Sequence, residues 1–380
     1  MSRRSGVTLV RLLVIIAALF LAAEAALRID RYGLSSAALG RWQPRLGWSA
    51  IRTLDEHGPW PRPGGSARWA LQAGSPEIEY RIDADGFRVA PGAAARRGAC
   101  RVLAVGDSNV FGYGVRAEEA LPAALEALLR ERGVDADVRN GGVCASDVAG
   151  QRHWLEVAAE RASPDVVILV LSPWSLRTDS PEDPTDPTLG EKLARGFIGA
   201  VSWPAARSAV VDRARRRLLH VVAPFTHWLP TSDAAWHLRP LLEARPEFEL
   251  RFKGAATYVE EMVGRVRAKN LTPLLVLVPL DVQTSASRNR LYATERLPYP
   301  SWGFVDRDYT QDRRYADDMA RLARELGVPL IDVTERLVTH ASESYLQNDY
   351  HLSAAGHRRV AEEIAAPASD ACQQAAVASK

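Results

Sequence analysis

The sequence predicts an α/β fold built around a five-stranded parallel sheet. From residue 101 to residue 366, short apolar runs alternate with segments whose apolar residues recur at helical spacing. The run at 164–171 is apolar almost throughout, as expected of a central parallel strand that is buried on both faces. This alternation is typical of a parallel sheet covered by helices.

The elements can be assigned in chain order. The expected strands are 102–105, 136–140, 164–171, 273–279 and 329–333. The expected helices are 121–132, 148–161, 257–269, 315–326 and 354–366. Ahead of them, residues 76–90 predict a small β-element, because apolar and polar side chains alternate over 78–82 and a turn sequence follows.

Composition excludes several classes of protein. The chain of 380 residues is 47% hydrophobic and 25% charged, which is ordinary for a globular protein. A formal net charge of +2 gives no general attraction to nucleic acid, so no nucleic-acid partner is expected. The cysteines, Cys100, Cys144 and Cys372, lack the CxxC spacing of zinc sites, and we expect no metal or other cofactor.

The first 30 residues predict export. Two arginines precede an apolar segment at 7–27, which favours a cytoplasmic N-terminus and an exported body. The uninterrupted apolar core at 12–23 has the length of a signal-peptide core, whereas Arg11 and Glu24 could reach the two interfaces if the whole segment spans. We expect residues 1–30 to form a single-pass membrane anchor with the rest periplasmic or extracellular. Secretion after signal cleavage is the alternative.

A long segment at 179–256 separates the third and fourth strands. It exceeds an ordinary connection and contains Trp203, Trp228 and Trp236. Loops that leave the C-terminal edge of such a sheet bind ligands, so we expect a lid or a substrate-binding insertion. A helical decoration with core tryptophans is the alternative.

Two motifs at opposite ends of this region carry candidate chemistry. Ser108 follows the first strand within Gly-Asp-Ser, and on its own it could simply cap a helix. Asp349 and His351 lie two residues apart near the last helix. A serine hydroxyl needs an imidazole base, and the imidazole needs a carboxylate to fix its tautomer. Together these side chains predict a nucleophilic serine site.

These motifs resemble those of the SGNH/GDSL hydrolase superfamily, and more narrowly its exported, membrane-anchored bacterial members. The matching residues are Gly106-Asp107-Ser108 with Gly112 and Gly114, Asn140 with Gly142, and Asp349-Tyr-His351-Leu with Gly356-His357. The resemblance implies a flavodoxin-like three-layer α/β/α sandwich. The resulting domain layout is an anchor at 1–30, a linker and small β-element at 31–99, a hydrolase domain at 100–372 and a disordered tail at 373–380.

The resemblance also implies roles for single residues. Ser108 would attack an ester carbonyl, His351 would transfer the proton, and Asp349 would orient His351. The oxyanion hole would use the backbone N–H of Ser108 and one from the second motif, which holds Gly142 and Ala145. In the third motif Trp174 occupies the position of the usual asparagine donor, so either the hole lacks this donor or Trp174, Ser172 or Ser175 replaces it.

The expected function is therefore hydrolysis of short acyl esters, with O-acetyl groups on an envelope or extracellular glycan as the leading substrate. The expected partners are an acylated carbohydrate or other small ester and, through the N-terminal helix, the membrane. Two alternatives stay open, namely acyl transfer to a polysaccharide hydroxyl and a non-catalytic glycan-binding or scaffold module.

Export would also permit a disulfide. Cys100 precedes the first strand and so lies at the N-terminal edge of the sheet. The last helix starts near His351 at the opposite edge and runs back, which brings Cys372 to the same end. Cys144 follows the second strand at the far edge. We therefore predict a Cys100–Cys372 bridge.

Overall fold

The computed structural model describes residues 11–27, 50–55, 58–69, 71, 76–92, 98–177, 210–211, 241, 245–288, 308–347 and 349–378. The chain divides into two compact units. One contains Met1–Trp48, Arg68–Glu77 and Pro187–Thr231, and the other contains Ser49–Ala67, Ile78–Asp186 and Ser232–Lys380. All candidate site residues lie in the second unit. Most of the expected insertion at 179–256 lies outside the described residues.

The described part of the first unit is chiefly a helix at residues 11–27. It exposes the large apolar side chains Leu12, Leu13, Val14, Ile15, Ile16, Leu19, Phe20 and Leu21. Glu24 is buried, and its Oε2 accepts a hydrogen bond from the Val210 N–H at 3.0 Å. Within the described part of the chain, no helix is both long enough and apolar enough for a bilayer crossing, so the expected membrane span is not found there.

The second unit is organised around the predicted parallel sheet. Its strands are β6 (Cys100–Gly106), β7 (Ala136–Gly142), β8 (Val166–Leu171), β9 (Thr272–Leu277) and β10 (Leu330–Asp332). They pair in parallel in the order β10-β9-β8-β6-β7. Numbered along the chain, this is the flavodoxin-like order 2-1-3-4-5, so the expected five-stranded parallel sheet is confirmed.

The β-element expected at 76–90 joins the same sheet. Strand β5 (Arg88–Val89) pairs antiparallel with β7, and β4 (Ile78–Ile82) pairs antiparallel with β5. Strand β3 (Ser66–Trp69) lies beside β4 and is the edge strand, so the sheet formed by the described residues has eight strands. Strands β1 (Arg52–Asp55) and β2 (Gly58–Pro61) form a separate antiparallel pair. The segment before residue 100 therefore extends the hydrolase sheet.

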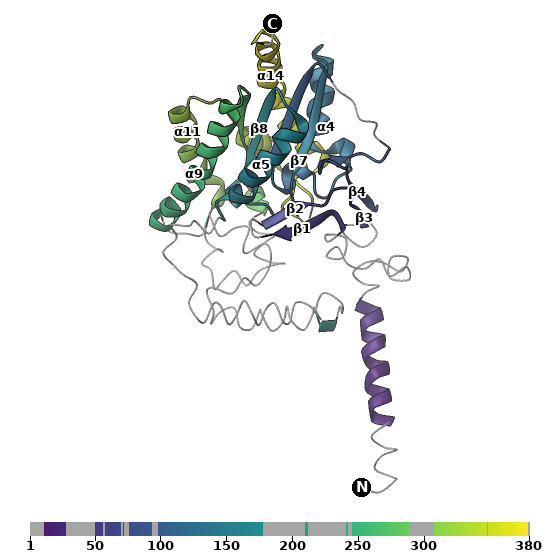
Figure 1. The fold of residues 1–380 in the computed structure, drawn as a ribbon. Helices are drawn as coiled ribbons and strands as arrows, with labels where there is room; N and C mark the ends of the chain where they lie inside the picture. The colour runs from purple at the N-terminus through teal and green to yellow at the C-terminus, as the bar shows by residue number, and fades with distance from the viewer. Residues whose placement is uncertain are drawn as a thin grey trace. The chain divides into compact units, whose positions relative to one another are not determined.

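Helices cover both faces of the sheet (Figure 1). One face carries α5 (Val148–Ala162), α9 (Arg245–Ala268) and α11 (Arg314–Leu326), and the other carries α4 (Leu121–Glu131) and α14 (Ala354–Ala378). Successive strand residues point to opposite faces, so Leu103 and Val105 enter one hydrophobic cluster while Val102 and Ala104 enter the other. The three-layer sandwich is thereby confirmed.

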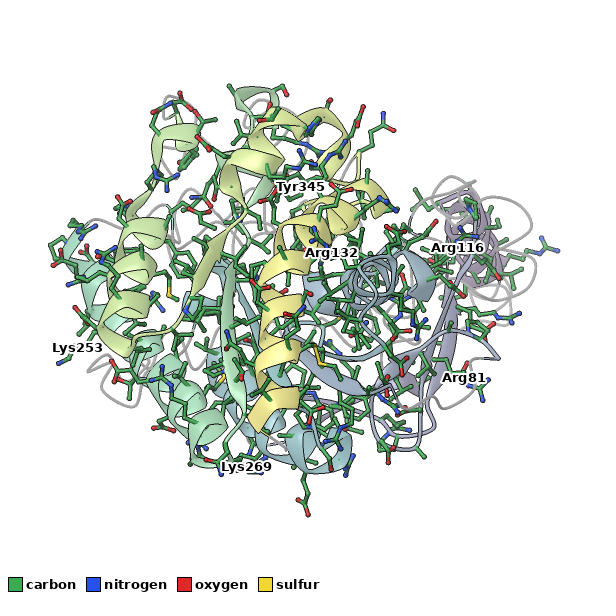
Figure 2. The ribbon with its side chains drawn as sticks, turned by 90° about the horizontal axis from the view of Figure 1, so that it is seen from above. Arg81, Arg116, Arg132, Lys253, Lys269 and Tyr345 are labelled. Atoms are coloured by element: carbon green, nitrogen blue, oxygen red, sulfur yellow. A yellow bond between two sulfur atoms is a disulfide. The ribbon has the colours of Figure 1, made fainter. Side chains whose placement is uncertain are left out.

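Two helices are longer than predicted. Helix α9 begins at Arg245 rather than at residue 257, because Phe248 and Phe252 are buried in the core. Helix α14 continues through Pro367 to Ala378, so residues 373–378 are helical where a disordered tail was expected. Lys253 of α9 and Arg81 of β4 lie at opposite sides of the domain (Figure 2).

Short elements complete the connections. They are the helices α3 (Ser108–Phe111), α12 (Thr334–Thr339) and α13 (Ala341–Ser344), and the 3-10 turns η1 (Ala117–Glu119), η2 (Pro173–Arg177), η4 (Asp281–Gln283) and η6 (Tyr309–Gln311).

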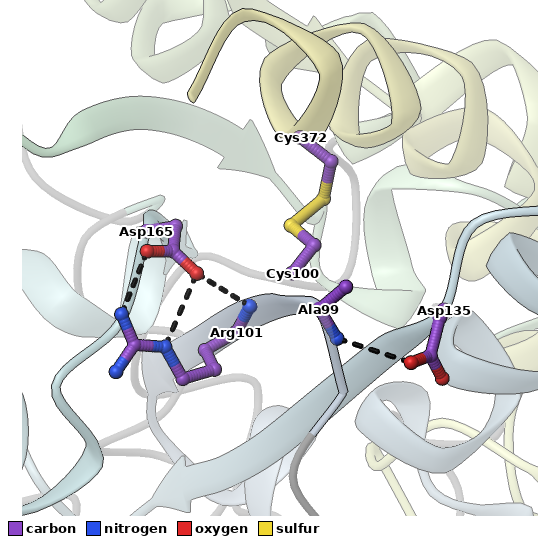
Figure 3. The surroundings of a disulfide bond; sticks show 6 residues. All are labelled: Ala99, Cys100, Arg101, Asp135, Asp165 and Cys372. Carbon is purple, nitrogen blue, oxygen red and sulfur yellow. Dashed lines mark hydrogen bonds and ion pairs between the residues drawn. A yellow bond between two sulfur atoms is a disulfide. The ribbon is translucent and has the colours of Figure 1, made fainter. Parts of the chain in front are cut away.

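The predicted disulfide is confirmed (Figure 3). Cys100 starts β6 and Cys372 lies on α14, with 5.6 Å between their Cα atoms. Cys144 remains a free thiol and is buried. Next to the bridge, Arg101 Nη2 pairs with Asp165 Oδ1 at 2.8 Å (Figure 3). The first strand of the parallel sheet is thus joined covalently to the last helix.

We expect this bridge to contribute about 3–5 kcal/mol to the free energy of unfolding, because it closes a loop of 272 residues in the unfolded chain. The measurement is denaturant unfolding with and without a reducing agent. Reduction should destabilise the wild type and the Cys144→Ala variant but leave the Cys100→Ala/Cys372→Ala double variant unchanged. An equal response in all three proteins would contradict a stabilising bridge.

Candidate active site

Ser108 lies where the strand order of the sheet reverses. Strand β6 ends at Gly106, and α3 begins at Ser108, so this serine leaves the C-terminal edge between β6 and β8. Asp107 caps α3, since its Oδ1 accepts from the Asn109 N–H at 2.8 Å. Its Oδ2 accepts from Ser172 Oγ at 2.9 Å, which ties the first motif to the third. Burial raises the pKa of Asp107, and these two hydrogen bonds oppose the rise.

The loop that carries Asp349 and His351 is closed on itself. Tyr345 and Leu352 form an antiparallel bridge at its base. Within it, the Leu346 N–H donates to the His351 carbonyl at 2.9 Å, and the His351 N–H donates to Asp349 Oδ1 at 3.0 Å. The backbone therefore holds the carboxylate and the imidazole in a fixed relation before their side chains interact.

Ser108, His351 and Asp349 form one chain of contacts. Ser108 Oγ lies 2.8 Å from His351 Nε2, and Asp349 Oδ1 lies 2.5 Å from His351 Nδ1. His351 is buried, at 7% exposure. The rings of Tyr113 and Tyr350 each have their centroid 4.4 Å from that of His351. The contact predicted between the two ends of the domain is present.

Arg288 holds the loop that carries Asp349 and His351, although it lies outside the motif. Its Nη2 donates to the Tyr345 carbonyl at 3.1 Å, and its Nη1 donates to the Leu346 carbonyl at 2.8 Å. Weaker contacts reach the carbonyls of Gln347 and Asp349, at 3.3 and 3.5 Å. A cation buried against several carbonyl oxygens retains its hydrogen bonds and restrains the backbone that supplies them. The loop is therefore held before substrate binds.

The second motif packs directly under α3. The Gly142 N–H, which the resemblance placed at the oxyanion hole, donates to Asn140 Oδ1 at 3.1 Å. Asn140 Nδ2 in turn donates to the Phe111 carbonyl at 3.3 Å. Ala145, at the position where the family usually has glycine, has a left-handed φ of 65°. A left-handed non-glycine residue costs about 1–2 kcal/mol, which explains why glycine suits this position.

The third motif forms η2. Trp174 is nearly buried, at 9% exposure, and the Ser172 hydroxyl is used by Asp107. Ser175 is fully buried, and its Oγ has no hydrogen-bond partner among the described residues. Of the two serines that could replace the asparagine donor, Ser172 is thus already engaged.

His357 has a structural setting. It is fully buried in α14, and neither ring nitrogen has a hydrogen-bond partner within the part of the chain that the structure describes. Burial lowers its pKa to about 3, so the ring is neutral near pH 7. Asn348, which holds the family's more usual carboxylate position, lies outside the described residues. The described ranges contain no cluster of three or more His, Cys, Asp or Glu side chains suited to a metal ion.

Sequence reasoning missed the contacts made by Tyr113 and Arg288. Tyr113 lies within the first motif, between Gly112 and Gly114, so an aromatic residue in this loop was a visible signal. Arg288 follows Ser-Ala-Ser and carries no local signal, because its partners lie 57 to 61 residues further along the chain. Only the fold reveals it.

We expect Gly142→Ala to distort the site, because an added Cβ would lie 2.0 Å from the Phe111 nitrogen. Such overpacking should cost about 1–3 kcal/mol in unfolding free energy and lower esterase turnover, since Phe111 and Ser108 share one helical turn. The control is Gly264→Ala on α9, where nothing lies within 4 Å, and a gain of about 0.5–1 kcal/mol is expected. Wild-type stability and turnover in Gly142→Ala would contradict this close packing.

Comparisons with known proteins identify the family. A comparison with curated protein sequences finds no match. Similar solved structures include a putative lipolytic protein of the G-D-S-L family from Desulfitobacterium hafniense DCB-2, with 14% identity over 70% of this chain and 98% of that chain and a TM-score of 0.35. A lipase/acylhydrolase from Enterococcus faecalis has 11% identity over 71% and 96% of the two chains, with a TM-score of 0.39. An acetyl xylan esterase, AlAXEase, has 14% identity over 70% and 98%, with a TM-score of 0.38.

The family model of the GDSL-like lipase/acylhydrolase family matches residues 104–359, which is more than half of the chain. This range begins within β6, ahead of Ser108, and ends within α14, beyond His351. The chain therefore belongs to the GDSL-like lipase/acylhydrolase family and is a serine carboxylic ester hydrolase.

Proposed function

We propose that the protein hydrolyses short acyl esters through a Ser108–His351–Asp349 triad. The observation that carries the proposal is the pair of contacts at His351, with Nε2 2.8 Å from Ser108 Oγ and Nδ1 2.5 Å from Asp349 Oδ1. Both contacts fall within the reach needed for proton transfer and orientation.

The proposed reaction proceeds in two stages. Asp349 accepts the Nδ1–H of a neutral His351, so that Nε2 can take the proton from the Ser108 hydroxyl as Oγ attacks the ester carbonyl. The resulting imidazolium returns this proton to the leaving alcohol, and the acyl group remains on Ser108. Water then attacks the acyl-enzyme, with His351 again as base. The Oγ–acyl bond breaks, the carboxylic acid leaves, and His351 returns the proton to Ser108 Oγ.

The proposed oxyanion hole uses the Ser108 N–H. Among the described residues nothing accepts a hydrogen bond from this N–H, as is usual at the first position of a helix. Ala145 and Trp174 are the proposed further donors, from the second and third motifs. Gly142 is left out of the hole because its N–H already bonds to Asn140.

The proposed substrate is an O-acetyl ester on a carbohydrate. Tyr113 and Tyr350 contact the His351 ring, and aromatic faces of this kind can pack against the apolar face of a sugar. The sequence at 179–256 adds three tryptophans but no long, uniformly apolar run of the kind that a long acyl chain would need. An acetylated glycan or another small ester therefore fits these residues better than a lipid.

We also propose that the catalytic domain acts outside the cytoplasmic membrane. The Cys100–Cys372 bridge supports this location, because disulfides persist in oxidising compartments. The arginines ahead of the apolar segment in residues 1–30 add the pattern of a targeting segment.

We expect Ser108→Ala to abolish hydrolysis of p-nitrophenyl acetate and of an acetylated xylan by the full-length protein. Loss of a triad nucleophile typically lowers kcat by about 10⁴-fold or more. Ser163→Ala, an exposed serine between α5 and β8, is the matched control and should keep wild-type turnover. Equal background rates for the wild type and Ser108→Ala on all acetyl esters would contradict the proposed triad.

The role of Trp174 is tested by a pair of variants. If Trp174 supplies the donor from the third motif, Trp174→Phe should lower kcat, by roughly 10²–10³-fold for a full donor. Trp174→Asn restores an amide donor and should hold or raise kcat. The measurement is steady-state hydrolysis of p-nitrophenyl acetate. Equal losses in both variants would assign Trp174 to packing instead.

A further inference from the structure

Arg88 of β5 is a buried cation whose hydrogen bonds all go to backbone carbonyls. It is 4% exposed, and its Nη1 donates to the carbonyls of Phe111 and Gly112 at 2.6 and 2.5 Å. Its Nη2 donates to the Val115 carbonyl at 2.7 Å. The guanidinium carbon lies 4.7 Å from the centroid of the Tyr80 ring and 4.9 Å from that of Phe111. In the described part of the chain it makes no ion pair with a carboxylate.

The Phe111 and Gly112 carbonyls belong to the far end of the turn that carries Ser108, and the Val115 carbonyl lies in the segment that follows. Helix α3 has only four residues, and the Ser108 carbonyl accepts from the N–H groups of Gly112 and Tyr113 at 2.9 and 3.0 Å. A single helical turn is unstable by itself, because it forms too few hydrogen bonds to offset the conformational entropy lost when its dihedral angles are fixed. The direction of Ser108 therefore depends on contacts from outside α3.

The β-element supplies those contacts. Besides Arg88, Tyr80 of β4 accepts from the Gly114 N–H at 3.0 Å through its hydroxyl. Burial lowers the pKa of Arg88 to about 10, so the guanidinium remains charged near neutral pH. A buried charge is tolerated only when it is well hydrogen-bonded, which makes the carbonyl positions and the cation mutually dependent.

We propose that Arg88 is a positioning residue that holds Ser108 in line with His351 by binding carbonyls at the end of α3 and in the segment that follows it. This inference rests on the proposed role of Ser108 as nucleophile. Arg88 lies outside the range matched by the family model and comes from the strand that extends the parallel sheet. The β-element thus acts on the reaction through the geometry of α3, without touching the substrate.

A pocket beside Arg88 makes a rescue experiment possible. This pocket has a volume of about 700 Å³ and is lined by Arg88 together with Arg81, Pro122 and Asn140, among others. Removal of the Arg88 side chain should open a path from this pocket to the three carbonyls. Arg81 lines the same pocket from β4, is exposed, and is the matched control (Figure 2).

The experiment compares full-length wild type, Arg88→Ala, Arg88→Lys and Arg81→Ala. For each protein we measure kcat and KM for p-nitrophenyl acetate, the rate of Ser108 labelling by a fluorophosphonate and the melting temperature. Each measurement is made with and without millimolar ethylguanidinium.

We expect Arg88→Ala to lower kcat and the labelling rate by about 10²-fold with nearly unchanged KM, because the nucleophile is displaced. Ethylguanidinium should restore at least a tenth of the lost activity there and have no effect on wild type or Arg81→Ala. Arg88→Lys, which keeps the charge but lacks the fork, should be intermediate.

The outcomes separate this inference from the proposed function. Absence of turnover and of Ser108 labelling in wild type would overturn the proposed function itself. Normal wild-type activity with unchanged kcat in folded Arg88→Ala, or a loss that ethylguanidinium leaves untouched, would overturn only the role of Arg88. If Arg88→Ala does not fold, Arg88→Lys decides. A lower kcat at wild-type KM supports the inference, and a wild-type kcat overturns it.

Discussion

The hydrogen bond between Ser108 Oγ and His351 Nε2 depends on the whole sheet, because 243 residues separate its partners. Ser108 follows β6, and His351 precedes α14. The same two elements are joined at their other ends by the Cys100–Cys372 bridge. Strand and helix are thus linked twice, covalently at the N-terminal edge of the sheet and by the Ser108–His351 hydrogen bond at the C-terminal edge. Between these two links, Ile168 and Val170 of β8 and Val360 of α14 belong to the same hydrophobic cluster.

Two buried arginines and one half-buried arginine from outside the motifs hold the loops that carry the candidate site residues. Arg88 binds carbonyls after Ser108, Arg288 binds those before His351, and Arg52 Nη1 donates to the Cys144 carbonyl at 2.7 Å, beside Ala145. A carbonyl accepts such a bond without titrating, so this support does not change with pH as a carboxylate partner would. The arginines arise from β5, from the segment after η4 and from β1. Elements that hold no catalytic group therefore contribute to the shape of the site.

The sequence allowed the parallel strands, the contact between Ser108 and His351 and the disulfide to be predicted, for identifiable reasons. The parallel strands are apolar runs, and parallel topology sends their C-terminal ends to one edge, which was enough to bring Ser108 and His351 together. The cysteine pairing followed from the direction of β6 and α14. The start of α9 was missed because Phe248 and Phe252 are spaced like core residues but lie among charged neighbours. The arginine contacts join residues that are far apart in the chain, so no local sequence pattern predicts them.

Two departures from the family pattern fall in the motifs proposed for the oxyanion hole, and a third places the proposed carboxylate at Asp349, where the family more usually has it at the position of Asn348. Ser108, His351 and Asp349 lie in contact, whereas Ala145 replaces a glycine and Trp174 an asparagine at positions proposed for the oxyanion hole. Ala145 retains the left-handed backbone that glycine would adopt, so its N–H keeps the direction set by that conformation despite the added Cβ. At Trp174 the side chain itself has changed, and a rigid indole N–H is the only donor it can offer. Under the proposed mechanism, the second motif has thus changed a side chain while keeping its backbone, and the third motif has changed the donor group itself.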